Sequence, residues 1–293
     1  MVIKRTLGDK LFDSANAIFL FLIAVLCLYP MLYVIFAAFS DPVQFATHSG
    51  VLLYPKGFSL EAFKIVFNNP NIITGYGNTI FYVVVGTFLN VLATILGAYV
   101  LSRKTFLLQK PMMKAIIFTM YFQGGLIPLF LLVNNLGLYN SRLALILPVL
   151  ITTYNLIVMR SSFSAIPVEL EESAKIDGAN DFVILFRIIL PVSKATTAVI
   201  ALFYAVDHWN SWFNSMIFLR DRDKFPIQLL LREILIANSS GGNTFEGMED
   251  DKALVYVLIK YATIVIATVP ILFIYPFCQR YFMQGVMVGS VKG

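Results

Sequence analysis

The stretch AIPVELEESAKIDGANDFVILFRIILP, Ala165–Pro191, lies between two long apolar runs and is itself rich in charge. At the centre of a bilayer, each charged side chain would cost about 2.5 kcal/mol or more. The charged residues in its first part are Glu169, Glu171, Glu172, Lys175, Asp177 and Asp181. This segment therefore lies in water, and the apolar runs on both sides of it are expected to cross a membrane.

The composition of the whole chain also indicates an integral membrane protein. Of its 293 residues, 58% are hydrophobic and 13% are charged, and the mean hydropathy is +0.78. This leaves too little polar material to cover a soluble fold of that length. The net charge of +5 does not come from a basic patch interleaved with aromatic residues, so nucleic-acid binding is excluded as a function class.

Windows of about twenty residues with few charges predict six membrane-spanning helices and hence an all-α polytopic membrane protein. The expected spans cover about 15–40, 77–102, 113–136, 141–163, 190–219 and 257–280. Together they make one membrane domain over residues 1–293. Cys27 and Cys278 lie within or at the edge of the first and last spans and fit no disulfide or zinc spacing. Neither a disulfide nor a metal site is therefore expected.

The basic residues predict the orientation of these spans. Lys and Arg gather before span one, between spans two and three, between spans four and five, and after span six. Because cytoplasmic loops carry the excess of basic residues, both termini and the Ala165–Pro191 segment are expected in the cytoplasm. The first apolar run, at about 25 residues, is longer than the ~7–15-residue core of a cleaved signal peptide, so it is expected to stay as an anchor.

The Ala165–Pro191 segment has the signals of two short helices joined by a tight turn. Pro167 suits a first helical turn, and the glutamates that follow it lie at the positive end of the helix dipole. Gly178 can close the helix in a left-handed conformation, and Asn180 or Asp181 can cap the next helix. A helix over about 167–178 is therefore expected between spans four and five. From patterning alone, it is either a docking helix or a plain polar link between membrane helices.

The same segment carries a spaced motif. Glu172, Ser173 and Ala174 precede Gly178, and Ile188–Pro191 follow it, at the spacing EAA, three residues, Gly, nine residues, I-x-LP. The chain thereby resembles the membrane permease subunits of bacterial binding-protein-dependent ABC importers, with Ser173 in place of one Ala. Other stretches resemble the carbohydrate-uptake, maltose-type branch of that family and its oligosaccharide or polysaccharide-fragment subgroup. They are GGLIPLFLLVNNLGLYNSRLALILP (Gly124–Pro148), HWNSWFNSMIFL (His208–Leu219) and QRYFMQGVMVGSVKG (Gln279–Gly293).

The resemblance implies a non-catalytic subunit of an ATP-driven importer in the bacterial cell membrane. Its partners would be a second, different permease, two ATPase subunits, an extracytoplasmic sugar-binding protein and the sugar or oligosaccharide that this protein delivers. The sequence has no G-x-x-x-x-G-K-[ST] phosphate loop, so ATP and magnesium would be bound by the ATPase partners, and this chain would hold no cofactor. The resemblance assigns ATPase coupling to Glu171, Glu172, Ser173, Ala174, Asp177, Gly178 and Ala179.

Span five carries the candidate substrate path, because its polar groups are costly in lipid unless they face water or one another. Indole faces and amides suit sugar rings and hydroxyls. The candidate residues are Tyr204, Asp207, His208, Trp209, Asn210, Trp212 and Asn214. An interfacial aromatic belt and asparagine bonds between helices are the alternative explanation. Asn90 in span two and Gln123 in span three are weaker candidates, which bonding between helices explains equally well.

A long outer loop, Arg220–Lys252, begins as an amphipathic stretch and continues as ANSSGGNTFEGMEDD, which has the composition of an exposed loop. The resemblance implies that an outer loop reaches into the binding protein. The residues expected to do so are Asn238, Ser239, Ser240, Gly241, Gly242 and Asn243. A solvated hairpin is an equal alternative.

Two other function classes are weighed against the importer subunit. A self-sufficient secondary transporter of a polar solute would show an inverted repeat, and none is visible in the sequence. His208 beside Asp207 has no second intramembrane carboxylate with which to form a proton relay. An intramembrane serine protease is disfavoured because the only histidines are His48 and His208 and no G-x-S-x-G occurs. The sugar stays open, although the lack of basic residues deep in the spans favours a neutral glycan weakly.

Overall fold

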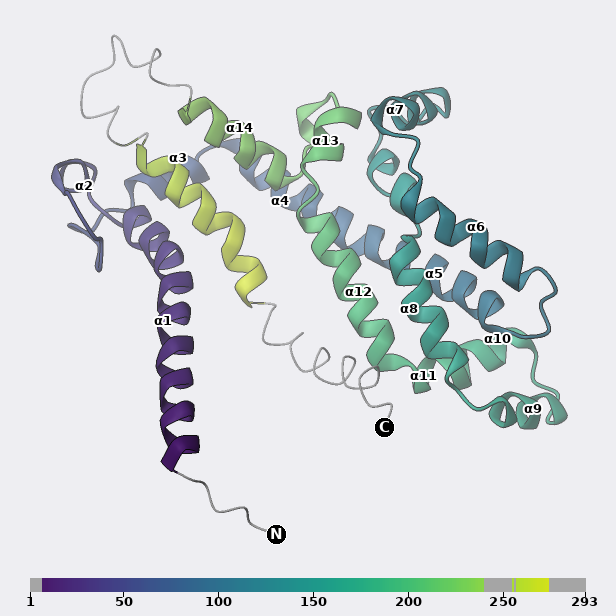
Figure 1. Cartoon of the computed structure of the whole chain (residues 1–293). Helices are drawn as coiled ribbons and strands as arrows, with labels where there is room; N and C mark the ends of the chain where they lie inside the picture. The colour runs from purple at the N-terminus through teal and green to yellow at the C-terminus, as the bar shows by residue number, and fades with distance from the viewer. Residues whose placement is uncertain (1–6, 240–254, 256, 274–293) are drawn as a thin grey trace. The chain divides into compact units, whose positions relative to one another are not determined.

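The computed structural model describes residues 7–239, 255 and 257–273, and these residues form helices and connecting loops with no strand among them (Figure 1). The all-α class expected from the sequence is confirmed. By their internal contacts the residues form two compact units, Met1–Asn69 with Glu233–Val269, and Pro70–Arg232 with Pro270–Gly293. Each unit is described by itself.

The first unit contains the long helix α1 (Leu7–Ala38), with α2 (Pro42–Thr47), α3 (Glu61–Phe67) and most of the helix Val257–Phe273. Most of α1 is apolar and exposed, as expected for a helix that faces lipid. Near its end, the rings of Tyr33, Phe45 and Tyr261 pack edge to face with centres 5.8–6.4 Å apart. These aromatic contacts hold α1, α2 and the Val257–Phe273 helix together.

The second unit begins with a continuous rod, Pro70–Ser102, made of α4 (Pro70–Phe81), the π-helical turn η1 (Tyr82–Gly86) and α5 (Thr87–Ser102). The later elements are α6 (Gln109–Tyr121), α7 (Leu126–Asn135), η2 (Arg142–Leu145), η3 (Leu147–Val149), α8 (Thr153–Ser164), α9 (Val168–Ile176), α10 (Asp181–Ile184), η4 (Leu185–Ile189), α11 (Leu190–Val192), α12 (Lys194–Trp209), α13 (Phe213–Phe218), η5 (Arg222–Lys224) and α14 (Ile227–Ser239), of which the residues up to Arg232 belong to this unit. Figure 1 shows α9 and α10 at one end of this unit and α7 and α13 at the other.

Several apolar helices of the described residues fit a membrane. Gly8–Ala38 and Pro70–Ser102 are each long and apolar enough to cross it as a single helix. Three helix pairs pass the same test only together: α6 with α7 bends by 116°, η2–η3 with α8 by 51°, and the α10–α11 segment with α12 by 87°. Val257–Phe273 is apolar but shorter. The hydropathy pattern predicts one helix per window, and the structure adds backbone breaks, because hydropathy records side chains and not the course of the chain.

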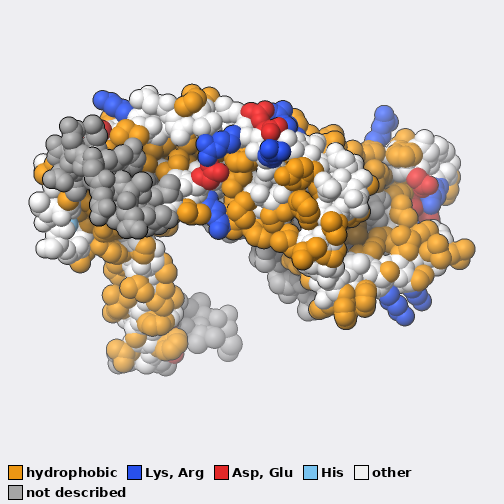
Figure 2. Space-filling view, turned by 90° about the horizontal axis from the view of Figure 1, so that it is seen from above, with side chains coloured by type: hydrophobic (Ala, Val, Ile, Leu, Met, Phe, Trp, Pro, Cys, Tyr) orange, Lys and Arg blue, Asp and Glu red, His pale blue; other side chains and the backbone are white. Residues whose placement is uncertain are grey.

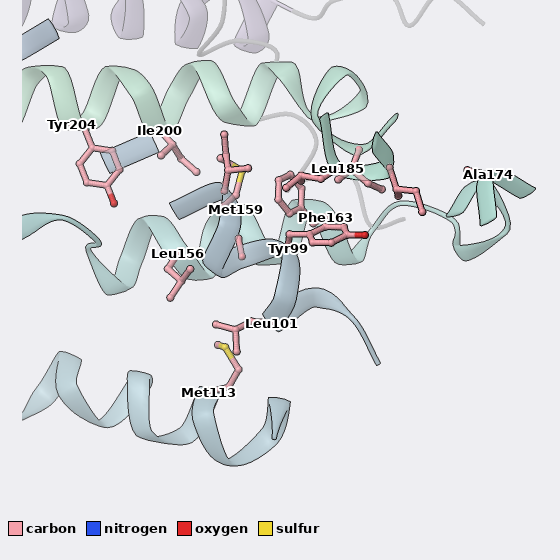
Figure 3. Close-up of a cluster of buried hydrophobic side chains, with 14 residues drawn as sticks. Tyr99, Leu101, Met113, Leu156, Met159, Phe163, Ala174, Leu185, Ile200 and Tyr204 are labelled. Atoms are coloured by element: carbon pink, nitrogen blue, oxygen red, sulfur yellow. The ribbon is translucent and has the colours of Figure 1, made fainter. Parts of the chain in front are cut away.

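The core of the second unit joins these helices. Buried side chains of α5, α8 and α12 pack together around Tyr99, Met159 and Ile200 (Figure 3). Met113 of α6 and Ala174 of α9 belong to the same cluster. Ala174 is the contact through which α9, although short and polar, is packed against the apolar helices. Figure 2, which views the molecule from above, shows hydrophobic side chains over much of the face drawn there, with Lys, Arg, Asp and Glu side chains between them.

Candidate functional site: the α9 segment and the polar junctions of the membrane helices

The α9 helix ends in a defined turn. The backbone N–H of Gly178 donates to Lys175 O over 3.0 Å, and that of Ala179 donates to Ala174 O over 2.9 Å. Gly178 has φ +81°, a left-handed conformation that a residue with a Cβ rarely adopts. The Asn180 side chain then accepts from Val183 N over 2.9 Å and caps α10. This turn fixes the direction in which the chain leaves α9.

Two faces of α9 differ sharply. Glu171 and Ala174 are buried, with 5% and 7% of their surface exposed, and Ala179 is half-buried. The opposite face is open to solvent and combines apolar with polar groups, for instance Ile176 at 86% exposure. Its other members are Val168, Leu170, Glu172, Ser173 and, in the turn, Asp177 and Gly178. The seven residues expected to couple to an ATPase therefore divide between an anchoring face and an exposed face.

Arg103, just after α5, holds the buried face of α9. Its guanidinium forms an ion pair with Glu171, and Lys175 donates to the other oxygen of Glu171 over 3.0 Å. Arg103 also donates to Phe163 O at the end of α8 over 3.4 Å and lies over the ring of Tyr99. Arg103 was not predicted from the sequence as part of this site. No local pattern distinguishes it from the other basic residues between spans two and three, which indicate the orientation of the spans in the membrane.

The polar residues of α12 do not share one surface. Tyr204 and His208 are buried, and both bind to α5: the Tyr204 hydroxyl lies 2.8 Å from Thr94 Oγ1, and Nε2 of His208 lies 2.9 Å from Asn90 Oδ1. Trp209 is also buried, and its Nε1 has no hydrogen-bond partner among the described residues. In contrast, Asp207 and Asn210 are exposed.

Asn90 and Tyr204 also bind the break between η3 and α8. Asn90 Nδ2 donates to Val149 O and Leu150 O over 2.6 and 3.0 Å, and the Tyr204 hydroxyl accepts from Thr152 N over 3.0 Å. Since the amide nitrogen of Asn90 is the donor to both carbonyls, its oxygen accepts from His208, whose Nε2 therefore carries the proton. We call this group, Asn90, Thr94, Thr152, Tyr204 and His208, the polar junction.

The π-helical turn η1 brings the polar junction together. A Cβ added to Gly86 would lie 2.4 Å from Nε2 of His208, so only glycine permits this approach. A wider π turn at this point also shifts the register of α5 relative to α4, which helps to aim Asn90 at α12. The sequence marked Asn90 and His208 as costly in lipid, and their pairing satisfies both.

A hollow of about 610 Å³ lies at the break between α6 and α7. It is open to the outside, and its polar lining comes from Thr119, Gln123 and Asn214. Gly125 in the break has φ +88°, and the rings of Phe118 and Phe122 stack with centres 4.3 Å apart beside it. No hydrogen bond within the described part of the chain reaches the backbone of Gln123 or Gly124.

The remaining candidates lie toward the outer loops predicted from sequence. Trp212 packs under Arg232 of α14, whose Cζ lies 3.4 Å from the ring centre. Asn140 O and Asp221 accept from Lys224, and the Lys224 ammonium, followed by the Asn140 amide, holds the pKa of the Asp221 carboxyl below its ordinary value. The side chains of Asn238 and Ser239, and all of Ser240, Gly241, Gly242 and Asn243, lie outside the described residues.

Comparison with known proteins identifies the family. Residues 90–288 match the model of the binding-protein-dependent transport system inner membrane component. The chain belongs to this family. It is 42% identical, over 97% of its length and 99% of the other, to the polygalacturonan/rhamnogalacturonan transport system permease protein YtcP of Bacillus subtilis. It is 28% identical, over 92% and 93%, to the arabinooligosaccharides transport system permease protein AraQ of Halalkalibacterium halodurans.

A solved structure agrees with this assignment. A chain of a bacterial ABC transporter involved in the import of the acidic polysaccharide alginate superposes with a TM-score of 0.87 at 30% identity, covering 96% of this chain and 100% of that one. The chain is thus a non-catalytic, multi-pass inner-membrane permease subunit of an ABC sugar importer, and ATP hydrolysis is the work of partner proteins. Family membership implies a partner permease, ATPase subunits and a substrate-binding protein.

Proposed function

We propose that α9 is the coupling helix that docks on an ATPase subunit at the cytoplasmic face. The observation that carries this proposal is the division of α9 into an anchored and an exposed face. Ile176 offers exposed apolar surface, and Glu172 lies one turn before it on the same open side. A helix fixed on one side and mixed in character on the other suits a groove in a soluble partner.

The topology that fits this role has six crossings with both termini in the cytoplasm. Two single helices, three bent pairs and the shorter apolar helix Val257–Phe273 would supply the six. Because Lys and Arg gather at the ends that share a side with α9, that side is the cytoplasm. ATP and magnesium then bind to two ATPase subunits beneath α9, and residues Asn238 to Asn243 on the outer side meet the sugar-binding protein.

We further propose that the hollow between α6 and α7 faces the substrate path formed with a second, different permease. Phe122 stands eight residues after Lys114, so at 1.5 Å per residue the break is about 12 Å from the membrane surface, within the hydrocarbon. Backbone groups without partners cannot face lipid, but they can line a watery cavity. Gln123 and Asn214 add amides that suit sugar hydroxyls, and the stacked rings of Phe118 and Phe122 suit sugar faces.

The substrate class that we infer is an oligosaccharide containing acidic sugars. The relatives that carry polygalacturonan and rhamnogalacturonan, and alginate, support an acidic glycan over the neutral one weakly favoured by the sequence. Arg232 supplies a cation for it: the guanidinium rests on Trp212 and has no hydrogen-bond partner among the described residues. The carboxylate of an acidic sugar would pair with this guanidinium.

The coupling role is tested by replacing Gly178 in the reconstituted importer. Gly178→Val is expected to lower trigalacturonate uptake about tenfold or more, because a β-branched residue resists the left-handed turn and re-aims α10. Open space surrounds the added Cβ, so packing is not disturbed. Gly178→Asn is the matched control, since Asn tolerates this conformation and is expected to keep most of the uptake.

Two outcomes would count against the proposal. One is a Gly178→Val importer that transports at the rate of the native protein, which would make α9 a plain polar link. The other concerns orientation: a single cysteine at Ser173 is expected to resist a membrane-impermeant maleimide in intact cells and to react in inverted vesicles. Labelling from outside intact cells would place α9 on the wrong side of the membrane for an ATPase.

A further inference from the structure

The end of α5 is a meeting point for four other helices of the second unit. Leu101 O accepts from Gln109 of α6 and from Arg160 of α8, each over 2.8 Å. The Tyr99 hydroxyl donates to Asp181 at the start of α10 over 3.3 Å. Arg103 adds the ion pair with Glu171 of α9. The position of α9 is therefore set by α5 as well as by its own chain neighbours.

The Arg103–Glu171 pair is mostly removed from solvent, with 17% and 7% of the two side chains exposed. A buried pair of this kind holds its partners in one geometry, because separating them leaves two charges without compensation. Ser102 Oγ accepts from Nε of Arg103 over 3.0 Å, and the Tyr99 ring lies 4.8 Å from its Cζ. The guanidinium is thus fixed on the α5 side before it contacts α9.

The opposite part of α5 is bound to α12 through the polar junction. Asn90 and Thr94 contact His208 and Tyr204 there. The chain itself also leads from α9 through Gly178, α10 and α11 into α12. A displacement of α9 can therefore reach α12 by two routes, one along the chain and one through Arg103 and α5. Two parallel routes keep α5 and α12 moving together, as a rigid-body transition requires.

We propose that Arg103 is a positioning residue that links the coupling helix to α5, so that α9, α5 and α12 move as one body during transport. This inference rests on the proposed docking of α9. It assigns Glu171 and its neighbour Glu172 different tasks: Glu171 faces inward and transmits movement, whereas Glu172 faces outward toward the ATPase. Neither task can be read from the sequence, in which both are adjacent acidic residues of one helix.

The test measures the distance between α9 and α5 in the complete importer with its binding protein. Spin labels are placed on Val168 and Val100, which are 55% and 46% exposed, after Cys27 and Cys278 are changed to Ser. With the native pair, the label distance is expected to be the same without nucleotide and after trapping with MgATP and vanadate. In Glu171→Gln or Arg103→Gln it is expected to change by about 2 Å or more on trapping. The charge-swapped Arg103→Glu/Glu171→Arg variant is expected to restore the constant distance.

Control variants distinguish loss of the link between α9 and α5 from loss of docking and from misfolding. Glu169→Gln makes the same change at an exposed position of α9 and is expected to behave like the native protein. Arg103→Gln/Glu171→Gln removes both charges and is expected to insert normally and to co-purify with the ATPase, while the label distance still changes on trapping. A label distance that changes on trapping in the native protein, or that stays constant in Glu171→Gln, would overturn the proposed link between α9 and α5.

The failure of docking looks different. Glu172→Lys is expected to reduce ATPase co-purification by about tenfold, whereas Glu171→Gln should leave co-purification within about twofold of the native level. If Glu172→Lys leaves ATPase co-purification unchanged while Glu171→Gln changes the label distance on trapping, the docking role fails and the link between α9 and α5 stands. If Glu172→Lys reduces co-purification and the label distance stays constant in the Arg103 and Glu171 variants, docking stands and the link between α9 and α5 fails.

Discussion

Two of the breaks in the membrane helices of this permease differ in whether their backbone groups have hydrogen-bond partners among the described residues. At Val149–Thr152, where η3 ends and the chain turns into α8, the polar junction supplies hydrogen bonds to two carbonyls and one N–H. At Phe122–Gly125, between α6 and α7, no hydrogen bond in the described part of the chain reaches Gln123 or Gly124, and a hollow opens there instead. Lipid tolerates neither kind of break alone. The first break is therefore stabilised by hydrogen bonds within the protein, and the second fits a surface that faces water.

The largest effect that tests this comparison is expected at Asn90. Asn90→Leu keeps a similar volume but leaves Val149 O, Leu150 O and His208 Nε2 without their partner, at a cost of about 2 kcal/mol. The melting temperature of the purified permease pair in detergent should fall by several degrees. Asn135→Leu makes the same change on the exposed end of α7 and should have little effect. Equal melting temperatures for the two variants would contradict a structural role for the junction.

A smaller loss of stability is expected for substitution of Gly125, whose left-handed backbone conformation shapes the break between α6 and α7. Its φ of +88° is strained for any residue with a Cβ, so Gly125→Ala should destabilise by about 1–2 kcal/mol. Gly124→Ala is the control, because a Cβ there meets only Pro128 at 3.7 Å, an ordinary contact. Thermal unfolding in detergent compares the two. If Gly124→Ala is as harmful as Gly125→Ala, packing and not backbone conformation shapes this break.

The smallest change in stability is expected at Gln123, together with a loss of transport. Gln123→Leu removes an exposed amide that has no partner in the described residues, so the free energy of unfolding should stay within about 0.5 kcal/mol of the native value. If the open break lines the sugar path, trigalacturonate uptake should still fall severalfold. Uptake at the native rate, with unchanged stability, would move the path away from the hollow.

The sequence predicts where the apolar helices lie but not where they break. Hydropathy reads Leu126–Asn135 as a continuation of Gln109–Tyr121, although a bend of 116° separates them. The bend depends on the backbone conformation of Gly125, and the other break depends on Asn90, which lies 59 and 60 residues from the carbonyls it binds. Such long-range hydrogen bonds leave no periodic trace in the sequence.

The polar residues of α12 show the same limit. Their cost in lipid correctly predicts that each must find water or a polar partner. It does not decide between the two: His208 binds Asn90, whereas the adjacent Asp207 is exposed. Likewise, Glu171 and Glu172 lie about 100° apart around α9 and so point in different directions, but only the position of Arg103, 68 residues earlier, determines which of them is buried.

The separation of Arg103 and Glu171 along the chain also has a consequence for synthesis. Arg103 leaves the ribosome 68 residues before Glu171, so for that interval its guanidinium has no carboxylate to pair with. An unpaired guanidinium resists entry into hydrocarbon, and it therefore keeps the end of α5 at the membrane surface while the following helices insert. One side chain thus acts first as a topological signal in the nascent chain and later as half of an ion pair in the finished subunit.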